Sequence, residues 1–545
     1  MSVDRIERTL ACCLAAVASL LVFPTLGQQA LWQDEGQTAV VAQNVLRTGL
    51  PSASDGTNLV SIFVDHRDIR SGISIWQPFA PVYAAAASMA IAGQNAAAAR
   101  FPFAVAFVVL VVATYRIVRR WSHNRQAALT TALLMAGSVV LLLHARQCRY
   151  YLLAPLFNLL IVHSYLLLRV KPRWSVTFGL IVWATLLINS FFPGAIVLAV
   201  GIAIDGLLRN PGKPTWRCLL LAAAIVTVVN LPMAVFLKVW SRPFGVQPGY
   251  SSFPVFALYL LRYLLTVNLY FFPILLLIPA SIIAVRQART RALPDNGLLV
   301  CSWIVCLTQL VGFALISDYP FTRYLVGAAP FLFYLGAVSV QRITSGRSLL
   351  LWPLLILLIF TNGVGVILAL PARGLFRDVP WTTAGIDGRF LQPGKVGISF
   401  ARGEIATILR EGFGSPLLSY AKSVVHPPRG PVDVILEVLR KEAKPSDVVK
   451  ISYEDLSLMF HTDLNVVSAS TIGPAAPDWI IERYLSRMRA DPDFVEATMK
   501  SPYEERTLPI PDVQWNNQPD PVYHFYDELP SGIAPSLKLF KKIKR

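Results

Sequence analysis

The residues best suited to chemistry are two adjacent carboxylates, Asp34 and Glu35, which follow the first long apolar stretch of the chain. Arginines stand at Arg146, Arg149 and Arg323, each near the end of a later apolar stretch. A carboxylate can take the proton from an attacking hydroxyl, and guanidinium groups can hold the negative charge of a departing phosphate. These residue types are therefore suited to the transfer of a group away from a phosphate.

Composition shows why the two carboxylates are unusual. Residues 1–370 contain ten Asp and Glu against 27 Lys and Arg, whereas residues 371–545 contain 22 of each, so the first part carries the whole net charge of +17. The chain is 54% hydrophobic with a mean hydropathy of +0.53, and apolar runs of about 20 residues recur as far as Leu370. This pattern indicates a polytopic α-helical membrane protein, and its basic excess reflects topology more than nucleic-acid binding.

The positions of Lys and Arg predict the topology, because these residues accumulate on cytoplasmic loops. Residues 1–370 are expected to form a catalytic membrane domain, and residues 371–545 a soluble extracytoplasmic α/β domain. About eleven transmembrane helices are expected near 9–30, 100–118, 126–144, 151–168, 174–191, 193–208, 217–237, 268–285, 297–316, 322–340 and 348–370. The N-terminus is then cytoplasmic and the C-terminal domain lies outside, with a bacterial inner membrane as the expected location.

Two apolar segments do not fit this set of spans. Residues 78–93 are too short for a hydrocarbon core about 30 Å thick, so they are expected to form an interfacial helix within an outer loop, 31–99. Residues 255–265 are placed on the outer surface, where Arg262 would contact lipid headgroups.

Helix and strand patterns alternate in the C-terminal part, which is typical of a small α/β unit. Residues 432–441 are expected to form an amphipathic helix, 447–453 a strand and 454–460 a second helix. Residues 538–545 are expected to form a basic tail that contacts anionic lipid or is disordered. Acceptor binding or covering of the site is the expected role of this domain.

Several motifs, taken in order, resemble the GT-C superfamily of glycosyltransferases. The Asp34-Glu35 pair with the run 37–51 is similar to the first outer loop of that superfamily, and the run 145–151 to its arginine-glutamine signature. The remaining matches are Pro81–Tyr83, Ala99–Pro102 and Phe321–Tyr324. The resemblance covers most of residues 9–345 and is nearest to the branch that contains protein O-mannosyltransferases and aminoarabinose transferases.

This resemblance implies a polyprenyl-phosphate sugar donor, an active site on the non-cytoplasmic face and inversion of the anomeric centre. The catalytic base of the family falls on Asp34 by motif match. One motif departs from the pattern: Gln77-Pro78 stands where relatives have Lys-Pro-Pro or His-Pro-Pro, so no lysine or histidine role can be carried over.

The resulting hypothesis is a membrane glycosyltransferase that moves a sugar from a polyprenyl-phosphate donor to an extracytoplasmic lipid, glycan or protein. Asp34 would act as the base, with Glu35 as a second catalytic residue that orients or supports it. No cofactor and no metal is expected, and no nucleic acid is expected to bind. The other expected site residues are Arg146, Arg149, Arg323 and Tyr150 at the donor phosphate, and His66, His144 and Tyr324 at the substrate.

Structural alternatives remain for each group. Asp34 could cap a helix with Gln37, and Glu35 could be a solvated acid in its first turn. Arg146 and Arg149 could extend toward water from helix ends, and Arg323 could pair with Asp318. The cluster 65–68 could join Glu35 around a divalent ion. For the whole chain, the alternatives are a polytopic transporter or a non-catalytic lipid-binding protein.

Overall fold

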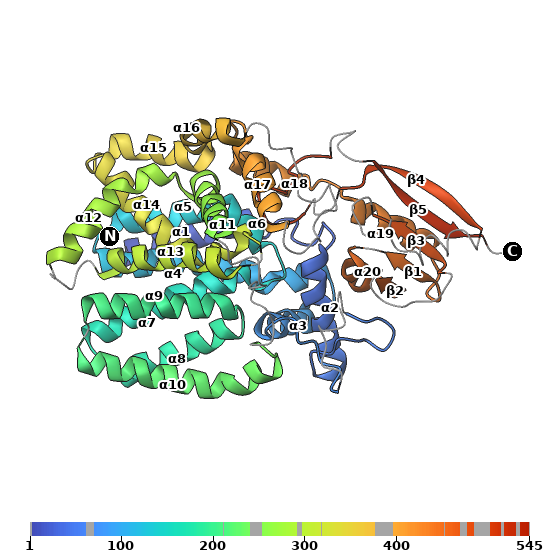
Figure 1. Cartoon of the computed structure of the whole chain (residues 1–545), viewed down its shortest axis with the longest axis horizontal. Coiled ribbons are helices and arrows are strands. Elements are labelled where there is room, and N and C mark those ends of the chain that lie inside the picture. The colour runs from blue at the N-terminus through green and yellow to red at the C-terminus, as the bar shows by residue number, and fades with distance from the viewer. Residues whose placement is uncertain are drawn as a thin grey trace.

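The computed structural model shows a bundle of helices at one end of the molecule and a small sheet at the other, with further helices between them (Figure 1). It describes residues 3–60, 70–210, 212–239, 253–290, 297–317, 319–376, 396–451, 453–468, 477–483, 502–513, 517–529 and 535–543.

We call the helical bundle the membrane unit. Its helices are α1 (Val3–Val22), α4 (Ala96–Ser122), α5 (Arg125–Ala136), α6 (Val139–Ala145), α7 (Leu153–Val170), α8 (Trp174–Ile188), α9 (Phe192–Arg209), α10 (Lys213–Phe236), α11 (Phe253–Thr266), α12 (Ile278–Thr290), α13 (Gly297–Ile316), α14 (Ala329–Ile343), α15 (Ser348–Phe360) and α16 (Gly363–Arg373).

Seven helices in the described part of the chain are long and apolar enough to cross a membrane, or up to nine if each of two bent pairs counts as one span. The polytopic class is confirmed, but the number of eleven spans is not. One reason is length, since α8 has only 15 residues. Residues 255–265 belong to a helical stretch, Phe253–Phe271, that is itself long and apolar enough to cross, so their expected position on the outer surface stays a prediction.

The outer loop contains two helices, α2 (Gln33–Thr48) and α3 (Ala80–Ala92). Gly49 ends α2 with a left-handed backbone (φ 77°), and its N–H donates to the Val45 carbonyl at 2.8 Å. At 13 residues, α3 is shorter than a membrane span, as the length of the apolar run predicts.

In the C-terminal part, two helices pack on the membrane unit and two others pack with the sheet in a small sheet domain. The first two are α17 (Val396–Leu409) and α18 (Pro416–Val425), and the sheet domain contains α19 (Pro431–Glu442) and α20 (Asp455–His461). The strands are β1 (Val448–Ile451), β2 (Asn465–Ser468), β3 (Trp479–Glu482), β4 (Tyr503–Pro511) and β5 (Ser536–Lys542). The domain boundary stays a prediction, since α16 runs across residue 370 and ends at Arg373.

The sheet has the strand order β2-β1-β3-β5-β4. Strands β2 and β3 pair with β1 in parallel, and β5 pairs antiparallel with both β3 and β4. The predicted elements at 432–441, 447–453 and 454–460 correspond to α19, β1 and α20. The predicted basic tail is wrong, because residues 536–542 form β5 with its alternating Leu537 and Leu539 buried.

One hydrophobic cluster joins α2, α3 and the start of α4 to the sheet domain. It contains Val40 and Val82 from the outer loop together with Ile435 and Trp479 from the C-terminal part. Helix α2 approaches α20 so closely that a Cβ atom on Gly36 would lie 2.7 Å from the Leu456 carbonyl carbon. The sheet domain is therefore packed directly on the helix that carries Asp34.

Candidate active site

Asp34 lies in the first turn of α2, on its partly exposed side. Its Oδ2 atom accepts a hydrogen bond from Arg323 Nη1 at 2.8 Å and lies 3.7 Å from Arg149 Nη2. The positive end of the helix dipole also favours a carboxylate here. The capping alternative is wrong for Asp34, because the N-cap is Trp32 and its N–H donates to Glu35 Oε2 at 3.4 Å.

Arg323 lies in a short 3-10 turn, Thr322–Tyr324, between α13 and α14. Besides Asp34, its Nη1 donates to the Tyr151 hydroxyl at 3.4 Å. The guanidinium carbon lies 4.2 Å from the centre of the Phe321 ring, a distance that permits a cation–π interaction. Asp318, the alternative partner for Arg323, lies outside the described residues.

Arg149 precedes the turn Tyr150–Leu152 that leads into α7. Its Nη1 donates to Thr38 Oγ1 at 3.1 Å and to Gln77 Oε1 at 2.5 Å. Burial opposes the charge of Arg149, but the nearby Asp34 carboxylate raises its pKa above the ordinary value, so the group stays cationic. Gln77, which stands in place of the Lys-Pro-Pro or His-Pro-Pro motif of the resembled family, is thus in direct contact with a predicted site arginine.

A cavity of about 300 Å³ lies against these groups and includes Arg149, Arg323 and Gln77 in its lining. Aromatic rings form one wall: Phe191 stacks on Tyr150 at 4.6 Å and lies 6.1 Å from Tyr324, with nearly parallel planes. Two cations beside an apolar wall fit a ligand with a negatively charged head and an apolar body. Four predicted site residues therefore share one cavity.

Several polar atoms around this cavity are buried and have no partner in the described part of the protein. They include Arg149 Nε, Arg323 Nε and Gln77 Nε2. A buried donor without an acceptor is costly, so such groups often mark a place where a ligand or water binds. All three are N–H donors, which match the oxygens of a phosphate.

Glu35 is completely buried and does not line this cavity. Arg100 Nε and Nη2 donate to its two carboxylate oxygens at 2.8 and 2.7 Å, and the Cys148 N–H donates to Oε1 at 2.8 Å. These contacts hold the start of α2 against α4 and against the segment that carries Arg149. The solvated alternative for Glu35 is wrong, and its geometry is that of a positioning residue rather than one that touches substrate.

Arg146 points away from the cluster, contrary to its expected place at the phosphate. Its Nη1 donates to the carbonyls of Val22 and Pro24 at 2.9 and 2.6 Å, and its Nη2 to the Thr25 carbonyl at 3.0 Å. These carbonyls belong to the last turn of α1 and the turn that follows it. Arg146 therefore ties α6 to α1 and does not line the cavity.

His144 also lies apart from the cavity, contrary to its expected place at the substrate. His144 is buried at the end of α6, where Nδ1 lies 2.7 Å from the Val140 carbonyl and the ring contacts Tyr151 edge-on at 4.9 Å. His66 and the cluster 65–68 lie outside the described residues. Within the described part, no group of three or more His, Cys, Asp or Glu could hold a metal ion.

Sequence reasoning missed three residues of this site: Arg100, Thr38 and Gln77. Arg100 stands in the motif Ala99–Pro102, and Gln77 marks the departure from the family, so both had a signal that was not turned into a role. Thr38 had no such signal. It lies one helical turn after Asp34, and only the packing of Arg149 beside it shows that it contributes to the site.

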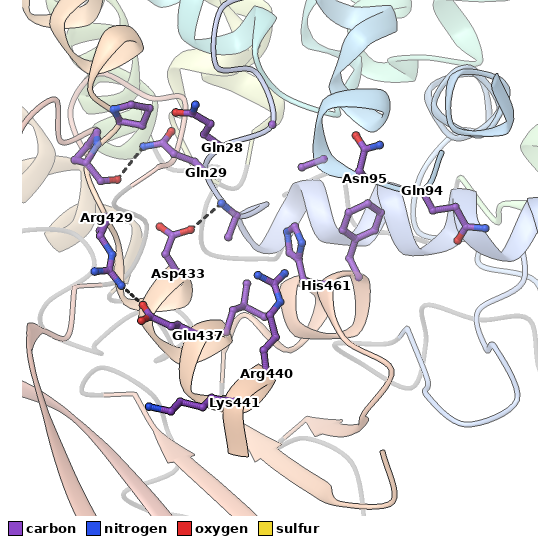
Figure 2. A pocket seen from close by; sticks show the side chains of 17 residues that line it. Gln28, Gln29, Gln94, Asn95, Arg429, Asp433, Glu437, Arg440, Lys441 and His461 are labelled. Atoms are coloured by element: carbon purple, nitrogen blue, oxygen red, sulfur yellow. Dashed lines mark hydrogen bonds and ion pairs between the residues drawn. The ribbon is translucent and has the colours of Figure 1, made fainter. Parts of the chain in front are cut away.

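A larger hollow of about 910 Å³ separates the membrane unit from the sheet domain (Figure 2). Its carboxylates are already engaged: Asp433 Oδ1 accepts from the Ala30 N–H at 3.0 Å, and Glu437 pairs with Arg429. Arg440 is exposed at its edge. Neither Arg149 nor Arg323 lines this hollow, whereas both line the smaller cavity. Asp34 lines neither cavity, but it accepts a hydrogen bond from Arg323 at the edge of the smaller one, so we place the chemistry there.

Comparison with known proteins gives a family match over part of the chain and a likeness of fold over most of it. Residues 76–240 match the family described as dolichyl-phosphate-mannose-protein mannosyltransferase. No curated protein matches the chain significantly in sequence.

The fold resembles ArnT from Cupriavidus metallidurans bound to undecaprenyl phosphate, with a TM-score of 0.56, 13% identity and 97% of each chain covered. The apo state of that protein gives a TM-score of 0.53 with the same identity and coverage. The Archaeoglobus fulgidus oligosaccharyltransferase in its apo form gives a TM-score of 0.47 at 10% identity, covering 94% of this chain and 75% of that one.

The family match includes Gln77 and Arg149, and the likeness of fold extends over nearly the whole chain. Residues 76–240 thus resemble that mannosyltransferase family, and the chain as a whole has the fold of the membrane protein ArnT.

Proposed function

We propose that this protein transfers a sugar from a polyprenyl-phosphate donor to an acceptor outside the cytoplasm. The observation that carries this proposal is the contact of Asp34 with Arg323 at 2.8 Å, beside a cavity that Arg149 also lines. The undecaprenyl phosphate bound to ArnT, which shares the fold, supports the class of donor. The acceptor is a lipid, glycan or protein that presents a hydroxyl group.

The arginines hold the donor phosphate in this proposal. Arg149 Nε and Arg323 Nε are unpartnered in the described part of the protein and can donate to phosphate oxygens. Tyr150, Phe191 and Tyr324 form an apolar wall for the first part of the lipid. The two guanidinium groups can stabilise the negative charge of the leaving phosphate, so we propose a reaction that requires no metal and no cofactor.

Asp34 acts as the base. It takes the proton of the acceptor hydroxyl, whose oxygen forms a bond to the anomeric carbon of the sugar. The bond from that carbon to the phosphate oxygen breaks, and its electron pair leaves with the polyprenyl phosphate. A single displacement of this kind inverts the anomeric centre, with the acceptor and the leaving group on opposite faces of the sugar.

Glu35 supports the base without touching substrate. Its double hydrogen bond to Arg100 and its bond to the Cys148 N–H fix the α2 turn relative to Arg149. We further propose that the protein lies in a bacterial inner membrane. Its N-terminus would be cytoplasmic, and the cavity and C-terminal domain extracytoplasmic.

The test uses purified protein in lipid vesicles with lipid-linked sugars extracted from the source membranes and a cell-envelope fraction as acceptor. Mass spectrometry then measures the polyprenyl phosphate released. Release that depends on both the acceptor fraction and Asp34 supports the proposal. Unchanged release by Asp34→Asn would contradict the assigned base, and no release by the native protein would contradict the reaction.

A further inference from the structure

A short piece of the C-terminal part, residues 517–520, contacts three segments next to Asp34, Arg149 and Arg323. The first segment leads into α2, which carries Asp34. The second lies between α6 and α7 and contains Arg149, and the third lies between α13 and α14 and contains Arg323. No local sequence pattern links 517–520 to any of them, since the contacts span between 198 and 487 residues.

Asp520 holds the turn that carries Arg323. Its Oδ2 accepts from the Thr322 N–H at 3.1 Å and its Oδ1 from the Thr322 hydroxyl at 2.9 Å. Asp520 is 4% exposed and Thr322 is completely buried, so water competes little for these bonds. Because Thr322 directly precedes Arg323, the two bonds fix the backbone from which the guanidinium extends toward Asp34.

Arg262 keeps Asp520 in place from the other side. It is completely buried: its Nη2 lies 3.4 Å from Asp520 Oδ2, and its Nε donates to Glu404 Oε2 at 2.8 Å. Its Nη1 also donates to Thr322 Oγ1 at 3.1 Å. The expected contact of Arg262 with lipid headgroups is therefore wrong, and Arg262 supports the loop before Arg323 instead.

Asn517 holds the other two segments. Its side-chain Nδ2 donates to the Ala30 carbonyl at 2.7 Å, four residues before Asp34. Its own carbonyl accepts from Gln147 Nε2 at 3.3 Å, two residues before Arg149. The same stretch before Asp34 is also bound by the sheet domain, because the Leu31 N–H donates to His461 Nε2 at 3.1 Å.

We propose that residues 517–520 are a positioning element of the active site, with Asp520 setting the place of Arg323 through Thr322. Without these bonds the turn at Thr322 is free to shift, and Arg323 then no longer meets Asp34 and the donor phosphate together. Asp520 and Asn517 are positioning residues and not catalytic ones, because they act through Thr322, Ala30 and Gln147. The C-terminal part thereby completes the site in addition to packing beside it.

A double-mutant cycle tests whether Asp520 acts through Arg323. Undecaprenyl phosphate affinity is measured for the native protein, Asp520→Ala, Arg323→Ala and the double variant, all in detergent. We expect Asp520→Ala to weaken binding roughly tenfold in the native background and to have little further effect when Arg323 is absent. An equal loss in both backgrounds, or none in the native one, would overturn the proposal.

Two milder variants of Thr322 distinguish loss of a hydrogen bond from general misfolding. Thr322→Ser keeps both hydrogen-bond donors and should bind like the native protein, whereas Thr322→Val loses the hydroxyl donor and should weaken binding severalfold. Asp527→Asn is the matched control in the same segment, since Asp527 pairs with Lys422 on the exposed surface. A serine variant as weak as the valine variant would count against the proposed hydrogen bonds.

Hydrogen exchange separates this proposal from the proposed function. Asp520→Ala should speed amide exchange in peptides that cover residues 319–325, whether or not any lipid phosphate binds. Unchanged exchange there would contradict the positioning role even in an active enzyme. If the native protein binds no lipid phosphate, the proposed donor is wrong. The exchange rate of residues 319–325 in Asp520→Ala would then still show whether Asp520 holds the turn at Thr322.

Discussion

Arg323 Nη1 lies 2.8 Å from Asp34 Oδ2, although 289 residues separate the two in the chain. This contact joins the first turn of α2 to the turn before α14. In the proposed reaction, one of these groups takes a proton and the other holds the leaving phosphate. Because of this pairing, Arg323 would contact both the bound donor phosphate and the carboxylate of Asp34. Arg149 Nη2 lies 3.7 Å from the same carboxylate oxygen.

Removal of either cavity arginine should weaken donor binding. Arg149→Ala and Arg323→Ala should each raise the dissociation constant of undecaprenyl phosphate roughly ten- to a hundredfold, because each removes a charge-assisted hydrogen bond. Binding is measured by tryptophan fluorescence or by thermal-shift titration in detergent. Arg440→Ala, at the edge of the larger hollow, is the control and should bind normally. Normal binding by Arg149→Ala with Arg323→Ala combined would refute the phosphate assignment.

Glu35 should matter chiefly for stability. Its replacement by Ala leaves Arg100, which is 4% exposed, without its carboxylate, and we expect a loss of about 3–5 kcal/mol in the free energy of unfolding. Glu437→Ala, which breaks an exposed pair with Arg429, should cost less than about 1 kcal/mol. Thermal unfolding in detergent compares the two. A Glu35→Ala protein as stable as the native one would show that the buried pair does not hold α2.

The contact between Gln33 and Asp455 should make stability depend on pH. Burial raises the pKa of Asp455 to about 6 from an ordinary value of 3.8, although Gln33 Nε2 donates to its Oδ1 at 2.6 Å. Asp455 Oδ2 and Gln33 Oε1 are both buried without partners in the described part of the chain. A protonated Asp455 could donate to Gln33 and complete a two-bond carboxyl–amide pair.

The sign of this effect follows from the raised pKa. The stabilising contribution of Asp455 is fully present below pH 3.8 and is lost as the pH rises through about 6. Its full size is at most about 3 kcal/mol, so the melting temperature should fall between about pH 4 and pH 7 and then level off. Asp455→Asn keeps an uncharged pair at every pH and should reduce this fall. An identical pH profile for the variant and the native protein would exclude the effect.

The aromatic wall should contribute to lipid binding as well as to packing. Phe191→Ala removes the ring between Tyr150 and Tyr324 and should cost about 3 kcal/mol of stability and weaken undecaprenyl phosphate binding. Phe178, a 67% exposed ring on α8, is the matched control, and its replacement by Ala should change neither. Soluble inorganic phosphate should inhibit the native protein and Phe191→Ala alike. Equal lipid affinity in both would argue against an apolar subsite at this wall.

Much of the fold could be predicted from local signals. The apolar runs indicated a polytopic bundle, and the periodicity of residues 432–460 predicted α19, β1 and α20 in order. The prediction of a basic tail was wrong because the charged residues alternate with Leu537 and Leu539. This short alternating pattern forms the strand β5 only when β3 and β4 lie beside it. The number of eleven spans stays unconfirmed, because helices such as α8, with 15 residues, are too short to be counted as spans by length and composition.

Membrane topology predicted which charged residues lie on the same side of the membrane, but not which of them form the site. Topology placed Asp34, Arg149 and Arg323 on the same side, and the structure brings these three together. Topology could not show that Arg149 lines the cavity and Arg146 does not, because both belong to one motif. Only the packing of the helices determines which of the two faces the cavity. The contact of Asp520 with Thr322 crosses 198 residues without a local pattern, so sequence alone had no means of finding it.

The most direct test of Asp34 as the catalytic base is Asp34→Asn in vesicles that contain lipid-linked sugar and acceptor. The change keeps the size of the side chain and removes its ability to take a proton. We predict that release of polyprenyl phosphate falls roughly 10²- to 10⁴-fold while binding of undecaprenyl phosphate stays within about threefold of the native value. Native turnover by Asp34→Asn, or equal loss of turnover and lipid binding, would contradict the role of Asp34 as the base.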